Sequence, residues 1–316
     1  MVSDDGWWSI GELAARAGVT VKTVRFYSDR GLLPEAGRSA GGHRRYGPES
    51  LDRLRLVRSL RGLDVPVPEV ERVLSRDDSS PDPGGALEEV LAGRLREVGS
   101  RLAALRWQEA SLRALRDSPA GERAERLALL GALPSPPGTA ALVAFWRRSL
   151  PVRLPRRVVT AVLDAVVPEP PAEPDPGQVL AFARLHALVS GSPPDGGGRF
   201  RVPPPLPEGS YRPGVLYEGL AEAYALAAAE ARQGREPGGG PALDGFVAAY
   251  AAALGARDTP EFRRGLLEPL ARGVCPATVR YWKLAAGLFP PGRPVPGALH
   301  HRLSLALRDQ VAREAA

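Results

Sequence analysis

Two short amphipathic segments, separated by a glycine, lie near the start of the chain. In the first, apolar side chains recur at helical spacing and predict one buried stripe of a helix, at Ile10, Leu13 and Ala14. Ser9 precedes the stripe and Glu12 follows three residues later, which is the spacing of a capping box. Gly18 predicts the end of the helix, because glycine accepts the left-handed conformation common at that position.

The second segment predicts a helix with two unlike faces. Thr20 stands at the position of its N-cap, and Val21 and Val24 point toward a core that Leu32 or Leu33 completes. The opposite face is polar and basic, with Lys22, Thr23, Arg25 and Tyr27. Two short helices joined by a tight glycine turn, the second with such a face, are typical of a helix-turn-helix that contacts DNA.

A basic, glycine-hinged loop follows in residues 35–46. It carries Arg38, Gly41, Gly42, His43, Arg44, Arg45 and Tyr46. Glycine lets the backbone approach a partner closely, and the arginine fork can hold two phosphate oxygens, so the loop predicts a wing along the DNA backbone. Each pattern alone also suits a solvated helix, in which Arg25 pairs with Asp29 one turn later. Their conjunction within one segment favours DNA binding.

One long amphipathic helix is predicted after this region. Residues 48–61 and 66–76 predict a further helix pair, and SSPDPGG at 79–85 predicts a hinge. Residues 86–116 then repeat apolar side chains at spacings of three, four or seven: Leu87, Leu91, Leu95, Val98, Leu102, Leu105 and Leu112. This seam is typical of a coiled coil. Either a second copy of the chain or its own C-terminal half covers it, and we favour the second copy.

The rest of the chain alternates helical stretches with proline and glycine clusters. Eight helices are predicted, at 139–150, 156–167, 178–189, 214–232, 242–256, 260–273, 276–287 and 297–313. With no clear alternating strand among them, the expected fold class is all-α, or mainly helical. The expected organisation is a winged helix-turn-helix domain in 1–78, a hinge in 79–85, a coiled-coil helix in 86–117 and a helical domain in 118–316.

Composition narrows the partners that the chain can have. Its 316 residues are enough for about two domains, and the net charge of +6 favours a polyanionic partner. Only Lys22 and Lys283 are lysines, and the abundance of Arg, Ala, Gly and Pro indicates a GC-rich genome, which weakens the charge argument. No apolar run suits a membrane span, and the opening MVSDDGWWSI has no signal-peptide core. We expect a cytoplasmic, nucleoid-associated protein.

Catalytic, cofactor and metal sites are not expected. Cys275 is the one cysteine, and the four histidines show no ligand spacing: His43, His186, His300 and His301. No phosphate loop, nucleophile elbow or zinc-protease motif stands out. Four aromatic residues are candidates to line an apolar ligand pocket between helices: Tyr224, Tyr250, Tyr281 and Trp282. Ordinary packing in a helical core is the alternative for each.

The string TVRFYSDRGLLP followed by GGHRRY resembles the N-terminal domain of the MerR family of bacterial transcription regulators. Residues 23–27 match the family's first run, residues 31–34 its second, and the wing matches at Gly42, Arg44 and Tyr46. His43 stands where the family usually has an aromatic residue that touches phosphate. The resemblance covers residues 7 to about 76 and the long helix that follows.

The resemblance implies a homodimer on a pseudo-palindromic promoter, formed by antiparallel pairing of the long helices. It implies distortion of promoter DNA, so that RNA polymerase reads it. Lys22 and Arg25 are the candidates to reach base edges, and the expected DNA contacts are Thr20, Lys22, Thr23, Arg25, Tyr27, Arg38, His43, Arg44 and Arg45. Metal-sensing members hold their ligand with cysteines near the dimer helix, and residues 77–120 contain neither Cys nor His.

A small apolar effector or a protein partner is expected to act on residues 118–316. The alternative function is a constitutive or architectural DNA-binding protein, whose C-terminal half binds other proteins without an effector.

One internal sequence similarity, called the echo below, lies at 270–290. It resembles residues 13–34 and suggests a second helix-turn-helix. No basic wing follows it, so Tyr281, Trp282, Leu284 and Leu288 more simply predict a packed helix face.

Overall fold

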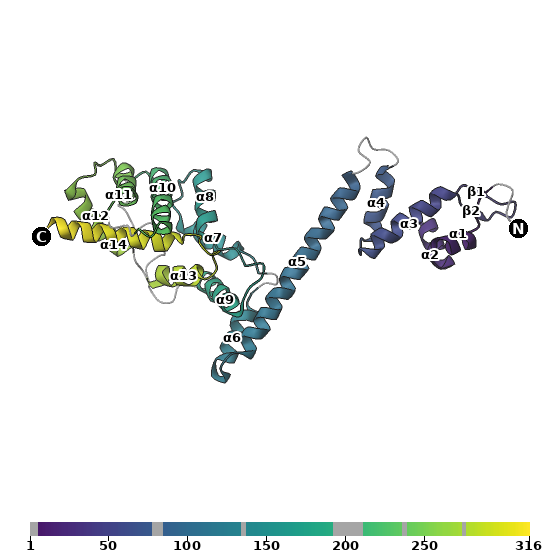
Figure 1. The fold of residues 1–316 in the computed structure, drawn as a ribbon, viewed down its shortest axis with the longest axis horizontal. Helices are drawn as coiled ribbons and strands as arrows, with labels where there is room; N and C mark the ends of the chain where they lie inside the picture. The colour runs from purple at the N-terminus through teal and green to yellow at the C-terminus, as the bar shows by residue number, and fades with distance from the viewer. Residues whose placement is uncertain (1–5, 78–84, 134–136, 192–210, 236–238, 274–275) are drawn as a thin grey trace. The chain divides into compact units, whose positions relative to one another are not determined.

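The computed structural model describes residues 6–77, 85–133, 137–191, 211–235, 239–273 and 276–316. The chain forms two compact units, Met1–Ser100 (unit 1) and Arg101–Ala316 (unit 2). Almost all of the regular structure is helical, as Figure 1 shows, and the prediction of a mainly helical fold is confirmed. The boundary between the units falls inside helix α5, Gly85–Arg116, and not in the hinge predicted at 79–85. Residues 79–84 lie outside the described residues.

Unit 1 begins with the two predicted helices. Helix α1, Ile10–Ala17, has the capping box, because the Ser9 hydroxyl accepts from the Glu12 backbone N–H and the Glu12 carboxylate accepts from the Ser9 N–H. Gly18 ends it with a φ of 63°, the left-handed conformation that glycine adopts without strain. Helix α2, Val21–Asp29, starts at Thr20, whose side chain accepts from the Thr23 N–H. Local sequence therefore determines both helices and the turn between them.

A small hairpin follows α2 and forms the predicted wing. Strand β1, Gly37–Arg38, pairs antiparallel with β2, Arg44–Arg45. Trp8 adds a bridge to Tyr46, with reciprocal backbone hydrogen bonds of 2.8 and 2.9 Å. The ring of Trp7 lies against Gly37, where any side chain would collide with it. The segment before α1 thus anchors the base of the wing.

Helices α3, Pro48–Gly62, and α4, Val67–Asp77, complete the core of unit 1 together with the first half of α5. Leu13, Val24, Leu54, Val57 and Val70 are fully buried there. Val90 of α5 is 1% exposed and belongs to the same core. Each predicted helix of this region is present within about two residues of its expected bounds.

Among its described residues, unit 2 contains the second half of α5 and ten further helical elements: η1 Ala120–Glu122, α6 Arg123–Gly131, α7 Ala140–Ser149, α8 Arg156–Val166, α9 Pro176–Ser190, α10 Pro213–Arg232, α11 Pro241–Leu254, α12 Pro260–Arg272, α13 Pro276–Ala286 and α14 Pro296–Glu314. Helices α9 to α12 and α14 have proline in the first turn, where the missing N–H costs no hydrogen bond. All eight predicted helices are present, and these prolines mark the starts of five of them. Helix α6, which directly follows the 3₁₀ turn η1, was not predicted from the sequence.

Besides a small cluster of Leu150, Val158 and Tyr217, two large hydrophobic cores hold unit 2 together. One joins α5, α7, α8, α9 and α13 around Trp107, Trp146, Phe182 and Tyr281. The other joins α10, α11, α12 and α14 around Phe246 and Tyr250. Figure 1 shows the helices of unit 2 from α7 onward in teal to yellow. Among the described residues, no helix combines the length and the apolar character that crossing a membrane requires.

Candidate nucleic-acid interface

The outer face of α2 presents two cations to solvent. Lys22 and Arg25 are exposed, and the structure gives neither of them a hydrogen-bond or ion-pair partner among the described residues. Thr20 and Thr23 lie beside them at the helix start, with their hydroxyls 2.8 Å apart. Lys22 and Arg25 are therefore the side chains of this face that can reach a ligand without breaking an internal contact.

Two residues of α2 lie on the side opposite to the one predicted. Tyr27 was expected on the outer face, but its ring is buried beside Val24. Val21 was expected in the core and is 40% exposed. The exposed aromatic residue is Phe26, which packs edge-on against Tyr27 and carries the guanidinium of Arg30 over its ring. The helix is rotated relative to the predicted phase, because of the two adjacent aromatic residues it is Tyr27 that faces the core.

Arg44 ties the wing to α2. Its Nη1 lies 2.5 Å from Oδ1 of Asp29 at the end of α2, and its Nε lies 2.7 Å from Oε1 of Glu35. Nη1 also donates to the Ser28 hydroxyl at 3.1 Å, and this buried hydroxyl lies 2.8 Å from the hydroxyl of Tyr46. The hydrogen bond to Asp29 raises the pKa of Arg44. Arg44 was expected to hold phosphate, and the structure instead engages its guanidinium with the protein's own carboxylates.

The other wing residues differ in their availability. Arg38 donates to Glu35 at 3.2 Å and remains 60% exposed. His43 is exposed at the hairpin turn, and its backbone N–H donates to the Ser39 hydroxyl. Arg45 is half-buried, and its side chain has no hydrogen-bond or ion-pair partner among the described residues. The pKa of Glu12 is lowered mainly by hydrogen bonds from Ser9, and the positive charge of Arg45 adds a smaller effect. Among Arg38, Arg44 and Arg45, Arg45 is therefore the one whose side chain has no hydrogen-bond or ion-pair partner in the described part of the chain.

The predicted seam of α5 is only partly covered by its own chain. Leu87 packs against the core of unit 1, and Leu91 is half-buried. The other five residues of the seam are 46–73% exposed: Leu95, Val98, Leu102, Leu105 and Leu112. A row of exposed apolar side chains at heptad spacing along one helix is a surface that water solvates poorly.

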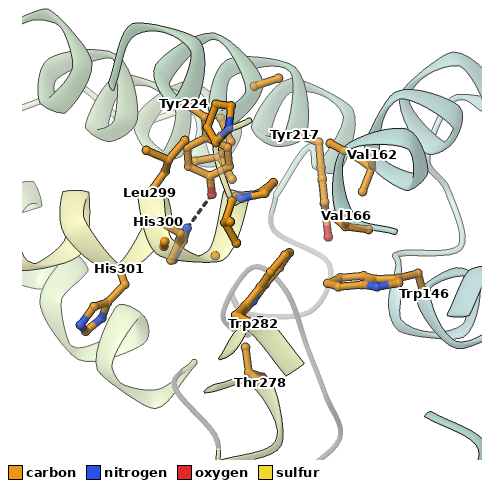
Figure 2. A pocket seen from close by; sticks show the side chains of 18 of the residues that line it. Trp146, Val162, Val166, Tyr217, Tyr224, Thr278, Trp282, Leu299, His300 and His301 are labelled. Carbon is orange, nitrogen blue, oxygen red and sulfur yellow. Dashed lines mark hydrogen bonds between the residues drawn. The ribbon is translucent and has the colours of Figure 1, made fainter. Parts of the chain in front are cut away.

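The four candidate pocket residues separate into two pairs. Tyr224 and Trp282 line a cavity of about 1090 Å³ in unit 2, shown in Figure 2. Tyr250 and Tyr281 are fully buried in the two cores and do not line it. Sequence reasoning did not identify Trp146 and His300, which also line the cavity. Their signal, an aromatic or polar residue on an apolar helix, is too common to point to a cavity.

The echo at 270–290 supplies part of this cavity and part of a core. Its helix α13 buries Tyr281, whose hydroxyl donates to the Val166 carbonyl at 2.8 Å and accepts from the indole N–H of Trp146 at 2.7 Å. Residues 274–275, at the turn of the echo, lie outside the described residues. The interpretation as a packed aromatic face fits this burial, since a recognition helix needs an open face.

Within the described part of the chain, no three side chains of His, Cys, Asp or Glu gather where they could hold a metal ion. Cys275 is not among the described residues.

The N-terminal region of the chain is similar to known helix-turn-helix regulators. The model of the MerR HTH family regulatory protein matches residues 8–77. The chain is 31% identical over 121 residues to the HTH-type transcriptional regulator ZntR homolog of Haemophilus influenzae. This match covers 38% of this chain and 90% of that protein. It is 41% identical over 101 residues to the HTH-type transcriptional activator TipA of Streptomyces coelicolor, over 31% of this chain and 39% of TipA.

A solved structure is also similar in sequence. It is that of the transcription regulator PbrR691 from Ralstonia metallidurans in complex with lead(II), with 33% identity and a TM-score of 0.32, covering 36% of this chain and 93% of that one. Each of these matches leaves more than half of this chain uncovered.

The Arg44 bridge generates a test by a double-mutant cycle. Arg44→Ala and Asp29→Asn should each lower the melting temperature of the full chain by roughly 2–5 °C, because each breaks a charge-assisted contact in a small domain. The double variant should lose clearly less than the sum of the two, since both remove the same contact. Arg45→Ala is the control and should leave the melting temperature nearly unchanged. Additive losses in the double variant would contradict the bridge.

Proposed function

Because the chain belongs to the MerR family of helix-turn-helix regulatory proteins, we propose that it binds promoter DNA as a homodimer, with α2 of each subunit in the major groove and each wing along the backbone. Members of this family are DNA-binding transcription regulators, and the chain is a regulator and not an enzyme. The observation that carries the proposal is the pair of exposed cations, Lys22 and Arg25, on the second helix of a helix-turn-helix.

Base reading and phosphate binding fall to different residues in this proposal. Lys22 and Arg25 reach base edges, where lysine and arginine favour guanine. Thr20 and Thr23 offer hydroxyls to phosphate at the start of α2, where the helix dipole also favours an anion. Arg45, Arg38 and His43 contact the backbone from the wing, and Arg44 acts by holding the wing in place. Tyr27 supports the helix from the core.

Dimer formation accounts for the exposed seam of α5. Pairing of α5 with the same helix of a second copy would cover Leu95, Val98, Leu102, Leu105 and Leu112 in one step. A symmetric dimer places two recognition helices on two half-sites of a pseudo-palindrome. The net charge of +6 steers such a dimer toward DNA.

Distortion of the DNA between the half-sites is the mechanism by which we propose that the dimer regulates transcription. Bending a site of this size smoothly costs about 1–6 kcal/mol, which contacts from both subunits offset. RNA polymerase then recognises a promoter whose two recognition elements are otherwise poorly spaced. Unit 2 switches this state, and its large apolar cavity favours a small-molecule switch over a constitutive DNA-binding protein with a protein-binding C-terminal half.

A DNA-binding assay with matched lysine variants tests the reading helix. On a fragment from upstream of its own gene, Lys22→Ala should lower specific affinity by about 1–3 kcal/mol and change the preferred base in each half-site. Lys283→Ala removes the other lysine of the chain, which lies in unit 2, and should leave DNA binding unchanged when no small molecule is added. If Lys22→Ala lowers affinity equally for specific and unrelated DNA, Lys22 does not read bases. No mobility shift of any fragment at low salt would contradict DNA binding itself.

Sedimentation of a seam variant tests the dimer. Leu102→Asp places a charge at the middle of the exposed row and should convert a dimer into a monomer at micromolar concentration, because burying an unpaired carboxylate costs several kcal/mol. Ser100→Asp adds the same charge two residues away, on another face of α5, and should remain dimeric. A wild-type monomer, or equal sedimentation of the two variants, would contradict pairing through this seam.

A further inference from the structure

The cavity of unit 2 has walls that the fold holds in place without a ligand. Its apolar wall includes Trp146 of α7 and Trp282 of α13, with ring centroids 5.6 Å apart. The hydrogen bonds of Tyr281 to Trp146 and Val166 fix α13 against α7 and α8. Gly297 at the start of α14 lies against the indole of Trp282, where a side chain would overlap it. These contacts hold the aromatic wall formed by α7, α13 and the start of α14 in place.

Small side chains keep the cavity open. Alanines line it from four helices, including Ala161 of α8, Ala221 of α10, Ala286 of α13 and Ala298 of α14. Its volume of about 1090 Å³ compares with roughly 300–1,000 Å³ for sites that bind drug-sized ligands. A molecule of two or three fused rings is smaller than this space and can enter it.

One neutral polar pair stands in this apolar lining. The hydroxyl of Tyr224 lies 2.7 Å from Nδ1 of His300, as the dashed line in Figure 2 shows. Burial lowers the pKa of His300 to about 4 and raises the pKa of Tyr224, so both are neutral at pH 7. The second ring nitrogen of His300, Nε2, has no partner among the described residues. The pair offers a hydrogen bond to a ligand without placing a charge in the cavity.

The charged residues that line the cavity are mainly basic. Glu218 is held by Arg157 at 2.8 Å, while Lys283 and Arg293 add two positive charges. Arg293 stacks on the ring of Phe289 and donates to the Asp164 carbonyl. Three cations against one carboxylate leave a net charge of +2. This balance repels cations and favours neutral or anionic molecules.

We propose that this cavity binds a planar aromatic small molecule that is neutral or carries one acidic group. Its rings lie against Trp146 and Trp282, its polar edge meets the Tyr224–His300 pair, and an acidic group reaches Lys283. That this molecule switches DNA binding rests on the proposed function, whereas the binding itself does not.

Binding to the full chain in the absence of DNA tests the site. Displacement of the fluorescent anion 8-anilinonaphthalene-1-sulfonate is measured with three naphthalenes of similar size: 1-naphthoate, 2-naphthol and 1-naphthylmethylammonium. We expect the anion and the neutral compound to compete at least about tenfold better than the cation, because of the charge around the cavity. Equal or stronger competition by the cation would overturn the assigned ligand class. No competition by any of the three would overturn the site.

Matched substitutions locate the binding. Ala221→Trp on α10 and Ala161→Trp on α8 place an indole on the cavity wall and should each weaken 1-naphthoate about tenfold or more, since the indole covers part of the apolar surface that the ligand rings contact. Ala248→Trp on α11 replaces an exposed alanine that does not line the cavity and should change binding less than twofold, in keeping with the small effects of such surface changes. Lys283→Gln should weaken 1-naphthoate about threefold and leave 2-naphthol unchanged, as expected for an exposed charge.

Equal loss in the Ala248→Trp control, or no loss in either cavity variant, would place the binding elsewhere, for example on the seam of α5. Since no DNA is present, failure of these experiments leaves DNA reading untouched, and failure of the Lys22→Ala assay leaves this site untouched.

Discussion

The ion pairs of Arg44 join the wing to the recognition helix α2, and the geometry of the DNA-binding face depends on this link. Two strands of two residues each cannot position a wing by their own pairing. Arg44 joins the wing to the end of α2 through Asp29 and to the preceding loop through Glu35, which also holds Arg38. Helix and wing are therefore presented to DNA at a fixed spacing, and fixed spacing lets phosphate contacts set the register of base contacts.

Local signals in the sequence predicted the helices of this protein, but not its contacts between distant residues. The capping box at Ser9, the left-handed Gly18 and the proline starts of unit 2 each depend on a few neighbouring residues, and all three kinds of signal appear in the structure. The Arg44 bridge spans 15 residues to Asp29, and the motif shows only that the position is basic. Likewise, periodicity could not decide whether Phe26 or Tyr27 faces the core, because both neighbours are aromatic.

The cavity shows a similar limit. An aromatic residue in a helix suggests burial, yet Tyr281 fills a core while its neighbour Trp282 lines empty space. What separates them is the arrangement of the surrounding helices, and no sequence pattern encodes that arrangement. Helix α5 contributes Val90 to the core of unit 1 and Trp107 to the core of unit 2. A ligand of unit 2 can act on DNA binding only if it binds one state of the protein more tightly than another.

Hydroxyl-radical footprinting of the full chain on the region upstream of its gene tests the central claim most directly. A dimer that reads two half-sites and distorts the DNA between them should protect two segments whose centres are separated by a whole number of helical turns, each about 10 base pairs. The intervening base pairs should show altered reactivity, because their backbone geometry changes. A single protected segment, or two segments joined by DNA with unaltered reactivity, would contradict the account.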